Sequence, residues 1–490
     1  MIGIILNTPA FEQDIRELLM AYYPGETFVH EEGAEVSFYV RGSQNETQLF
    51  MEIVKKPFKE EENSEAEQVL FSGTANLVPE NRTESKSAVK LLLYQFLKEM
   101  NGGRELPWGT LTGIRPTKIA MSRLDQGWSE QEIADFMKKQ YQTSDEKINL
   151  SIEIAERERR LLSVLDYERG YSLYVGIPFC PTTCLYCSFT SYPIGKWRGK
   201  THLYLDALFK ELEYTAKRMQ GRKLDTIYMG GGTPTSLSPE ELDAIFTKME
   251  ELFDCKNALE FTVEAGRPDS ITREKLEVMR KHGISRISIN PQTMKQETLD
   301  LIGRHHTVDM VRDCFFMARE LGFDNINMDL IVGLPDETLV DVRYTMEEVC
   351  KMHPDSITVH SLAIKRAARL NLFRELYEGK IHGSQEMIDL TATYARQEGL
   401  EPYYLYRQKN MAGNFENVGY AKPGKACLYN ILIMEELQTI AACGAGTTTK
   451  VVFPAENRKE RVENVKEVEQ YIERIDEMIQ RKEKLLANLC

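Results

Sequence analysis

The stretch Tyr174-Val-Gly-Ile-Pro-Phe-Cys180-Pro-Thr-Thr-Cys184-Leu-Tyr-Cys187 joins the end of an apolar, strand-like run to three cysteines within eight residues. That run, residues 172–177, is the first of six strand-like runs that alternate with helical stretches as far as about residue 360. Repeated strand–helix units form a parallel sheet with right-handed crossovers. Six units fit either a doubly wound sheet or an incomplete β/α barrel. Both place their chemistry at the carboxyl ends of the strands, where this cysteine loop is expected to lie.

The predicted strands and helices share clear boundary signals. Pro239 stands where a helix should begin, and Gly283 and Gly322 stand where helices should end. The six predicted strands cover residues 172–177, 226–229, 260–263, 286–289, 325–332 and 356–360. The helices between them cover residues 203–219, 239–253, 271–282, 308–321 and 339–352.

The chain divides by pattern into three parts. Residues 1–165 mix strand-like and helical runs, which predicts an N-terminal α+β domain of unknown role. Residues 166–400 hold the alternating units and predict a partial (β/α)6 barrel. Residues 401–490 predict a C-terminal extension that covers the barrel and ends in a long, charge-laced helix over about residues 458–486.

Composition excludes several classes of protein. Of the 490 residues, 42% are hydrophobic and 28% charged, so the chain is neither disordered nor fibrous. Acidic residues outnumber basic ones 75 to 61, which argues against a nucleic-acid partner. No apolar run approaches the roughly 20 residues that span a bilayer, and the short run Ile2–Leu6 lacks the form of a signal peptide. We therefore expect a cytoplasmic protein without a membrane span.

The nine cysteines indicate a metal centre rather than disulfides. Six are scattered along the chain, and Cys180, Cys184 and Cys187 are clustered. Structural zinc and ordinary iron–sulfur clusters both take four protein ligands. Three thiolates on a four-iron cluster leave one iron open to another molecule. The alternative is a structural metal knuckle that a distant Cys or His completes, Cys255 being the next cysteine along the chain.

The C-x3-C-x2-C spacing after a first barrel strand resembles the signature of radical S-adenosylmethionine (SAM) enzymes. This resemblance implies that Cys180, Cys184 and Cys187 hold a [4Fe–4S] cluster whose open iron binds the amino and carboxylate groups of SAM. It also implies that one electron from the reduced cluster cleaves SAM to a 5′-deoxyadenosyl radical, with an electron donor such as flavodoxin or ferredoxin as partner.

Polar and glycine residues follow the other predicted strands. A Met229-Gly-Gly-Gly-Thr-Pro-Thr235 turn follows the second strand, and Glu264, Gln292 and Asp329 mark the ends of the third, fourth and fifth. Taken singly, each residue is typical of a hydrogen-bonded polar group at a strand end. Together, polar groups at the ends of successive strands indicate one binding site at the carboxyl end of the barrel. They are similar to positions that bind SAM in oxygen-independent coproporphyrinogen III dehydrogenases. The resemblance assigns the cofactor-binding role to Tyr174, Gly231, Gly232, Thr233, Glu264, Gln292, Arg304 and Asp329.

The long N-terminal region and Ile114-Arg-Pro-Thr117 resemble the HemZ-type subgroup of that family. The resemblance implies oxidative decarboxylation of two propionates of coproporphyrinogen III to vinyl groups, which gives protoporphyrinogen IX. Phe189 stands where the HemN type has a fourth cysteine, and Gly176 replaces a nearby His. A haem-binding chaperone of the same family and a radical SAM enzyme with another substrate therefore remain open. Guanidinium and ammonium groups that suit propionates are Arg286, Lys365, Arg366, Arg369 and Arg407.

Overall fold

The computed structural model describes residues 1–55, 67–113, 115–189, 191–363, 383–407, 415–487 and 489. The chain forms two compact units: residues 1–156 with 406–416, and residues 157–405 with 417–490. The domain borders that sequence pattern suggests near residues 165 and 400 stay a prediction. Within the described part of the chain, no helix is both long enough and apolar enough to cross a membrane.

The larger unit is built on a parallel sheet whose strands follow one another in chain order. Six consecutive strands run β6-β9-β10-β11-β12-β13, each hydrogen-bonded to the next. A doubly wound sheet would reverse its order at a switch point, whereas unbroken chain order is the arrangement of a β/α barrel. The prediction of an incomplete barrel is therefore confirmed. The strands are β6 Gly170–Ile177, β9 Lys223–Gly231, β10 Glu260–Gly266, β11 Arg286–Ile289, β12 Ile326–Val332 and β13 Ser356–Ser361.

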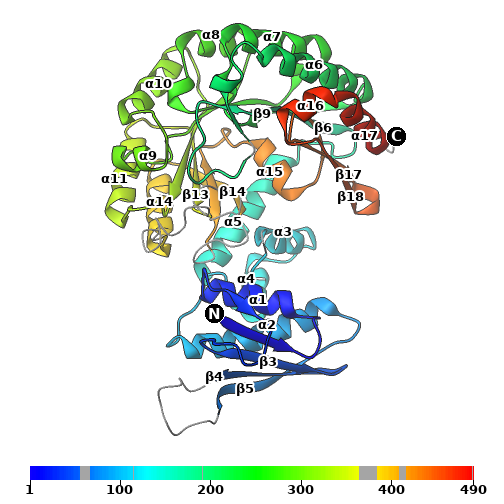
Figure 1. Ribbon diagram of the computed structural model, residues 1–490, viewed down its shortest axis with the longest axis vertical. Coiled ribbons are helices and arrows are strands. Elements are labelled where there is room, and N and C mark those ends of the chain that lie inside the picture. The colour runs from blue at the N-terminus through cyan, green and yellow to red at the C-terminus, as the bar shows by residue number, and fades with distance from the viewer. Residues whose placement is uncertain are drawn as a thin grey trace. The chain divides into compact units, whose positions relative to one another are not determined.

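Helices cover the outer face of this sheet (Figure 1). Their starts obey local capping rules: Ser238 accepts from the backbone of Glu241, whose carboxylate returns a contact to the Ser238 backbone, and Pro239 occupies the first turn. The helices begin and end within two residues of the predicted limits. They are α6 Thr201–Arg218, α7 Pro239–Leu252, α8 Arg273–Lys281, α9 Gln296–Leu301, α10 Val308–Glu320, α11 Leu339–Cys350 and α14 Gln385–Gln397, of which α9 and α14 were not predicted.

The inner side of the barrel is polar and is partly filled by a helix from the C-terminal region. Along β10, Phe261 and Val263 alternate with the polar Thr262 and Glu264, as strand geometry requires. Helix α15, Leu428–Glu435, brings Tyr429 onto the ring of Tyr228 on β9, with centroids 4.5 Å apart. Its first backbone amide, that of Leu428, donates to the Glu260 carboxylate at 2.6 Å. Because Glu260 begins β10, α15 occupies the interior near the amino ends of the strands.

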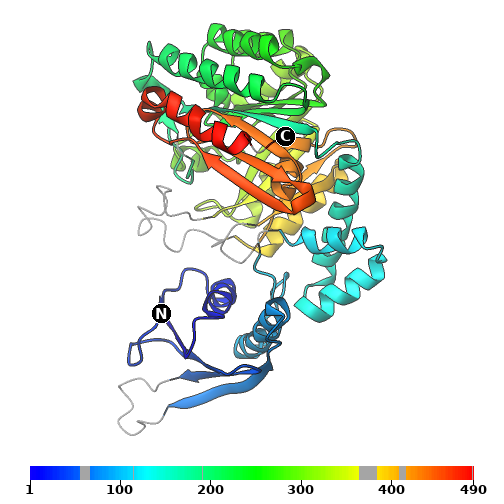
Figure 2. The same cartoon turned by 90° about the vertical axis from the view of Figure 1, so that its right-hand side faces the viewer.

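The remaining C-terminal strands extend the sheet at both ends. Strand β16, Thr439–Cys443, lies parallel to β6, and β17, Thr448–Phe453, and β18, Arg458–Glu463, continue beyond it. At the other end, β15, Asn417–Ala421, runs antiparallel to β13, with β14, Glu401–Tyr406, outermost. The last two helices, α16 Val468–Glu473 and α17 Ile475–Leu486, lie beside β16–β18 (Figure 2).

The predicted helix over residues 458–486 is therefore wrong in its first part. Residues 458–463 alternate half-buried and exposed side chains, and each pairs with a residue of β17. Charge content alone does not distinguish an edge strand that carries Lys, Arg and Glu from a solvated helix. The alternation of half-buried and exposed residues identifies this segment as a strand. The helical part is also shorter, since α16 ends at Glu473 and α17 starts afresh at Ile475.

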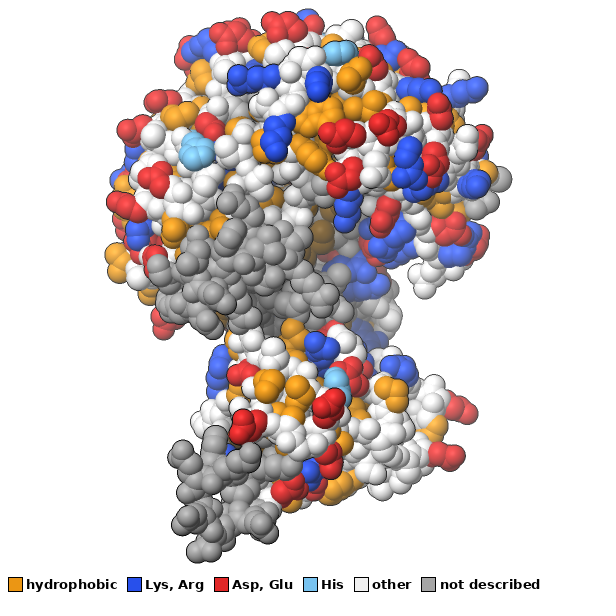
Figure 3. Space-filling model, viewed as in Figure 1, with side chains coloured by type: hydrophobic (Ala, Val, Ile, Leu, Met, Phe, Trp, Pro, Cys, Tyr) orange, Lys and Arg blue, Asp and Glu red, His pale blue; other side chains and the backbone are white. Residues whose placement is uncertain are grey.

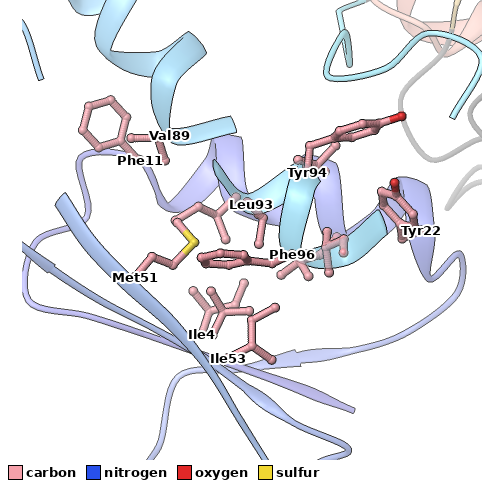
Figure 4. Packing of buried hydrophobic residues seen from close by; sticks show 14 of the residues in the cluster. Ile4, Phe11, Tyr22, Met51, Ile53, Val89, Leu93, Tyr94 and Phe96 are labelled. Carbon is pink, nitrogen blue, oxygen red and sulfur yellow. The ribbon is translucent and has the colours of Figure 1, made fainter. Parts of the chain in front are cut away.

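The smaller unit has an independent core. A five-stranded sheet of order β2-β1-β3-β4-β5 packs one face against α1 and α2. Figure 4 shows Ile4, Met51 and Ile53 of the sheet meeting Leu93 and Phe96 of α2. The elements are β1 Ile2–Leu6, α1 Glu12–Tyr22, β2 Phe28–Val29, β3 Tyr39–Gln44, β4 Gln48–Lys55, β5 Gln68–Asn76, α2 Arg82–Met100, α3 Thr117–Asp125 and α4 Glu130–Tyr141. Helix α5, Asp145–Leu162, begins in this unit, and its residues from 157 onward belong to the larger one.

Candidate functional site

The three clustered cysteines lie on the loop that follows the first barrel strand, as predicted. Cys180 ends the short strand β7, Phe179–Cys180, which pairs with β8, Tyr192–Pro193. Cys184 is buried, and Cys180 and Cys187 are half-buried. The Leu185 amide donates to the Ile302 carbonyl at 2.9 Å, which ties the loop to the segment after α9. The sequence thus places all three thiols in one loop at the carboxyl end of β6.

Polar side chains, among them Arg267 and Thr233, approach these thiols. Arg267 Nη1 lies 3.7 Å from Cys184 Sγ, and Thr233 Oγ1 lies 3.5 Å from Cys180 Sγ. Arg267 is 3% exposed and forms an ion pair with Asp269 at 2.7 Å. Burial raises the pKa of the Cys180 thiol, while the Thr233 hydroxyl and the Arg267 charge act in the opposite direction. A cation and a hydroxyl donor beside a thiol reduce the cost of forming the thiolate, which is the form that ligates iron, although burial remains the larger influence on the pKa of Cys180.

The chemistry of this donor set fits an iron–sulfur cluster. The loop offers three soft sulfur ligands, and Cys255, the candidate fourth cysteine of a structural knuckle, lies elsewhere. Cys255 begins a 3-10 turn just before β10 and is close to Tyr171 at the start of β6. Cys255 therefore lies near the amino ends of the strands, whereas the loop with the three clustered cysteines follows the carboxyl end of β6. Among the described residues, no three His, Cys, Asp or Glu side chains converge on a point that suits a single metal ion.

The glycine turn after β9 lies against the cysteine strand. The Gly232 amide donates to the Ile177 carbonyl at 2.8 Å, and the Thr233 amide donates to the Phe179 carbonyl at 2.6 Å. A Cβ at Gly232 would lie 2.5 Å from the Phe179 carbonyl oxygen, so no other residue fits there. Gly231 has a φ of +105°, and a Cβ on it would meet the Tyr174 hydroxyl. The need for glycine at 232 therefore comes from the neighbouring backbone.

Glu264 lies at the carboxyl end of β10 beside a stack of three tyrosines. The Tyr228 hydroxyl donates to Glu264 Oε1 at 2.6 Å. The Tyr228 ring stacks on Tyr174 at 6.1 Å and on Tyr429 at 4.5 Å. Burial raises the pKa of Glu264 to about 7, although the hydrogen bond from Tyr228 lowers it. The carboxyl group is therefore poised to gain or lose a proton near neutral pH.

Gln292 and Asp329 meet across the ends of β11 and β12. The Gln292 amide donates to the Asp329 carbonyl at 3.0 Å, and Gln292 holds a φ of +71°. Its side chain is 7% exposed, and its Oε1 atom has no hydrogen-bond partner among the described residues. The Asp329 carboxylate accepts from Asn327 at 2.7 Å and lies 3.8 Å from His360. Burial works to raise the pKa of Asp329, but His360 and Asn327 outweigh it and hold that pKa below its usual range.

Arg304 joins the cysteine loop to the strand ends. Its guanidinium donates to the Tyr186 hydroxyl at 2.8 Å and to the Asn290 carbonyl at 2.6 Å. Its Nε atom is buried without a partner among the described residues. Unpartnered buried polar atoms of Arg304 and Gln292 at one edge of the sheet are what a site for a polar ligand presents before the ligand binds. The residues present therefore fit a bound SAM.

Other residues considered from sequence lie outside this arrangement. His305 is exposed and His306 is buried, so the two imidazoles do not form a paired site. Burial and the neighbouring Arg304 lower the pKa of His306 to about 3, which keeps it neutral. Arg286 is buried inside the barrel and donates to Ser356 at 3.2 Å, and Arg407 belongs to the smaller unit. Lys365, Arg366 and Arg369 lie outside the described residues.

Sequence reasoning missed several residues of the site. Arg267, Tyr228, Tyr429 and Tyr186 all contact predicted site residues. A signal for Arg267 was available, because it follows Glu264 closely in the same strand-end segment. Tyr429 had none, since 165 residues separate it from Glu264 along the chain.

Comparison with known proteins agrees with this geometry. Residues 174–349 match the radical SAM superfamily model. The chain is 45% identical over 368 residues to the "Oxygen-independent coproporphyrinogen-III oxidase-like protein HemZ" of Bacillus subtilis, which covers 74% of this chain and 73% of that protein. It is 32% identical over 240 residues to the "Heme chaperone HemW" of the same organism, covering 48% of this chain and 62% of HemW.

A third relative has a solved structure. The "Oxygen-independent coproporphyrinogen III oxidase" of Escherichia coli is 32% identical over 196 residues, covering 40% of this chain and 42% of that protein. The structure of that organism's HemN superposes with a TM-score of 0.52 and 23% identity, covering 69% of this chain and 74% of HemN. This likeness confirms the radical SAM fold.

Proteins of the radical SAM superfamily use a [4Fe–4S] cluster and SAM, and these are the cofactors of this chain. The HemZ match covers more than two thirds of both proteins, and its 368 residues exceed the stretch 174–349 that matches the superfamily model. The chain therefore belongs to the HemZ-type family of oxygen-independent coproporphyrinogen-III oxidase-like radical SAM proteins.

Proposed function

We propose that this protein is a radical SAM dehydrogenase that converts two propionate side chains of coproporphyrinogen III to vinyl groups. The observation that carries the proposal is the extent of the likeness to HemZ, 368 residues at 45% identity. The likeness to the haem chaperone HemW covers 240 residues at 32% identity. Similarity outside the shared barrel bears on the substrate, because the barrel alone supports many different reactions.

The proposed roles follow from where the side chains lie. Cys180, Cys184 and Cys187 hold the cluster, and Arg267 places its positive charge 3.7 Å from the Cys184 sulfur. The remaining predicted residues surround the carboxyl ends of the strands and orient SAM. These are Tyr174, Gly231, Gly232, Thr233, Glu264, Gln292, Arg304 and Asp329.

Glu264 and Asp329 have different charge states and therefore different proposed roles. Asp329 keeps a low pKa and is a permanent anion for the positive charge of SAM, whereas Glu264, with a pKa of about 7, ionises when a hydroxyl or cation arrives. Gln292 Oε1 and Arg304 Nε supply an acceptor and a donor that lack partners among the described residues. When bound, the cofactors would supply the radical chemistry that takes a β-hydrogen from each propionate, and an external one-electron acceptor would take up the electron left when carbon dioxide departs.

The partners and compartment follow from this chemistry. We expect a porphyrinogen substrate, an electron donor such as flavodoxin or ferredoxin, and no nucleic acid, since the chain carries a net charge of −14. Free thiols that hold an oxygen-sensitive cluster fit the cytoplasm.

The test is anaerobic reconstitution of the cluster, followed by incubation with coproporphyrinogen III, SAM and dithionite. We expect two vinyl groups per product, detected as protoporphyrin IX after oxidation and chromatography. Cys184→Ala should lose the brown cluster absorbance and all product, while Cys255→Ala should keep both. Cluster absorbance and activity in Cys184→Ala would overturn the assignment of the ligands.

A second function has specific support. The HemW likeness and Phe189, which replaces a fourth cysteine, both fit a haem-binding chaperone. Stoichiometric haem binding, with SAM cleavage and without vinyl product, would favour that function over the dehydrogenase. SAM cleavage with neither haem binding nor vinyl product would point to another substrate.

A further inference from the structure

A turn close to the cysteine loop carries three exposed cations and no nearby acid in the sequence. Lys196, Arg198 and Lys200 are exposed, and residues 169–205 contain no Asp or Glu at all. The whole chain has an excess of fourteen negative charges, and acidic and basic side chains are interspersed over the barrel unit (Figure 3). This segment therefore differs in charge from the rest of the surface, because its cations have no acidic residues beside them in the sequence.

These cations are not used to stabilise the fold. Within the described parts of the chain, none of the three forms an ion pair with a carboxylate. The carboxylates that come near the turn are held by hydroxyl groups instead. Thr201 donates to Glu241, and Tyr192 donates to Glu467 at 2.6 Å.

The turn is joined directly to the strand that carries Cys180. It begins with a 3-10 helix, Ile194–Lys196, one residue after β8, and β8 places Pro193 opposite Cys180. Trp197, between two of the cations, is 6% exposed, and its ring lies 5.6 Å from that of Phe179. Phe179 precedes Cys180 in the chain. The three cations thus lie within three residues of Trp197 in the chain, and its buried ring contacts the residue next to a proposed cluster ligand.

We propose that the turn Lys196–Lys200 is the docking surface for an acidic one-electron carrier protein. The inference rests on the proposed function, because only a chain that holds a reducible cluster has use for such a partner. One electron leaves the reduced centre of the carrier and enters the cluster, so the carrier is oxidised by one electron, the cluster is reduced by one, and no bond is made. Like charge would otherwise oppose the approach of an acidic partner to a chain of net charge −14.

A carrier protein fits this surface better than a nucleic acid does. Duplex-binding proteins typically neutralise about 6–10 phosphates, and this turn offers three cations. The aromatic ring at its centre is buried rather than free to stack on a base. A small basic surface beside a redox centre matches the electrostatic steering that brings weakly bound, fast-exchanging partners together.

The test compares two reductants on the full, cluster-loaded chain. The variant Lys196→Glu/Arg198→Glu/Lys200→Glu is assayed for 5′-deoxyadenosine formation with a reduced acidic flavodoxin and, separately, with dithionite. With flavodoxin at low ionic strength we expect a rate lower by about tenfold or more, and a smaller difference as salt is added. With dithionite, which needs no docking surface, the rate should be unchanged.

A matched control separates the local surface from net charge. Lys217→Glu/Lys256→Glu/Lys484→Glu changes three exposed lysines of the same unit and gives the same total charge. This control should keep the flavodoxin-driven rate. Direct binding of flavodoxin to the chain without SAM, measured by NMR line broadening, should weaken only in the turn variant. A milder Gln triple variant at positions 196, 198 and 200 serves if the Glu variant does not fold.

Three outcomes would overturn the proposal: an unchanged flavodoxin-driven rate, an equal loss in the control, or an equal loss with dithionite. Tight binding of a nucleic acid to the parent chain through these cations would also count against it. Failure of the coproporphyrinogen assignment is distinguishable, because it appears as missing vinyl product while 5′-deoxyadenosine formation keeps its dependence on the turn.

Discussion

At the scale of single residues, the site combines groups whose ionisation differs although they belong to one chemical class. Asp329 and Glu264 are carboxylates at the ends of neighbouring parts of the barrel sheet. Asp329 has His360 and Asn327 to stabilise its charge, whereas at Glu264 burial outweighs the Tyr228 hydroxyl and the charges of Arg286 and His360. Their pKa values are driven apart by environment, in the manner of paired carboxylates that have separate roles.

The pKa of Glu264 predicts how SAM affinity depends on pH. Below about pH 7 the group is protonated in the free protein. A ligand that needs the carboxylate must then release a proton, so affinity should rise with pH up to about 7 and level off above it. From pH 6 to pH 8 we expect SAM to bind about tenfold more tightly, measured by anaerobic calorimetry on the cluster-loaded chain.

Two variants isolate this effect. Glu264→Gln should lose the pH dependence, and any slope that persists belongs to the groups of SAM itself. Glu337→Gln is the matched control: burial also raises the pKa of Glu337 to about 7, but its carboxylate accepts from Thr293, which is not among the residues predicted to bind SAM. The assignment fails if Glu264→Gln keeps the full slope of the parent protein.

At the scale of secondary-structure elements, a buried ion pair joins the C-terminal helix α17 to helix α6 of the barrel. Lys482 of α17 and Glu211 of α6 are 1% and 0% exposed, with Nζ and Oε1 2.7 Å apart. Glu211 also accepts from Tyr471 at 2.6 Å and from the Gly444 amide at 2.7 Å. This network holds the turn after β16, the strand that pairs with β6.

Removal of one partner should be costly. Lys482→Met leaves the Glu211 charge buried without its cation, and we expect it to lower the free energy of unfolding by about 3–5 kcal/mol. Lys484→Met, an exposed change in the same helix, should stay within about 0.5 kcal/mol of the parent. The double variant Glu211→Gln/Lys482→Met should recover part of the loss. Urea unfolding measures the free energy of unfolding of all three variants. A decrease below about 1 kcal/mol for Lys482→Met would show that the ion pair does not stabilise the fold.

The sequence predicts local elements better than long-range contacts. Strands such as Arg286–Ile289 and helices such as Val308–Glu320 agree with the prediction because apolar periodicity and Gly or Pro boundaries are local properties. The interior position of α15 was not predictable in this way. It depends on Tyr429 meeting Tyr228 and on Glu260 accepting from Leu428, contacts that join residues far apart in the chain.

The candidate site shows the same limit. The cysteine spacing and the polar strand ends are visible in the sequence, since β/α topology brings successive strand ends together. The tyrosine stack and the Arg267 contact with Cys184 depend on side-chain packing, which no spacing encodes. Gly232 shows the difference. The glycine motif can be recognised in the sequence, but the reason for glycine, the close Phe179 carbonyl, is known only from the folded structure.

At the scale of the whole molecule, the division into two compact units predicts its thermal behaviour. Each unit has its own hydrophobic core, so calorimetry should show more than one transition. The residues proposed to hold the cluster and SAM all belong to the larger unit. At a SAM concentration 100 times its Kd, the larger unit should gain about 2.7 kcal/mol, and its transition should move up while the other stays in place.

The control for this experiment is Cys184→Ala. Without the cluster, SAM should shift neither transition, although both should still be present. One cooperative transition that shifts as a whole with SAM would contradict the independence of the units.

The sheet order has a consequence for biosynthesis. Strand β6 carries the cysteine loop, and its neighbours are β9 on one side and β16 on the other. Because β16 lies roughly 200 residues after β9, at translation rates of about 5–20 residues/s it leaves the ribosome about 10–40 s later. If β6 and β9 pair during synthesis, β6 is an open sheet edge throughout that interval. We therefore expect iron loading to follow completion of the chain, because only then is the strand that precedes the three thiols paired on both sides.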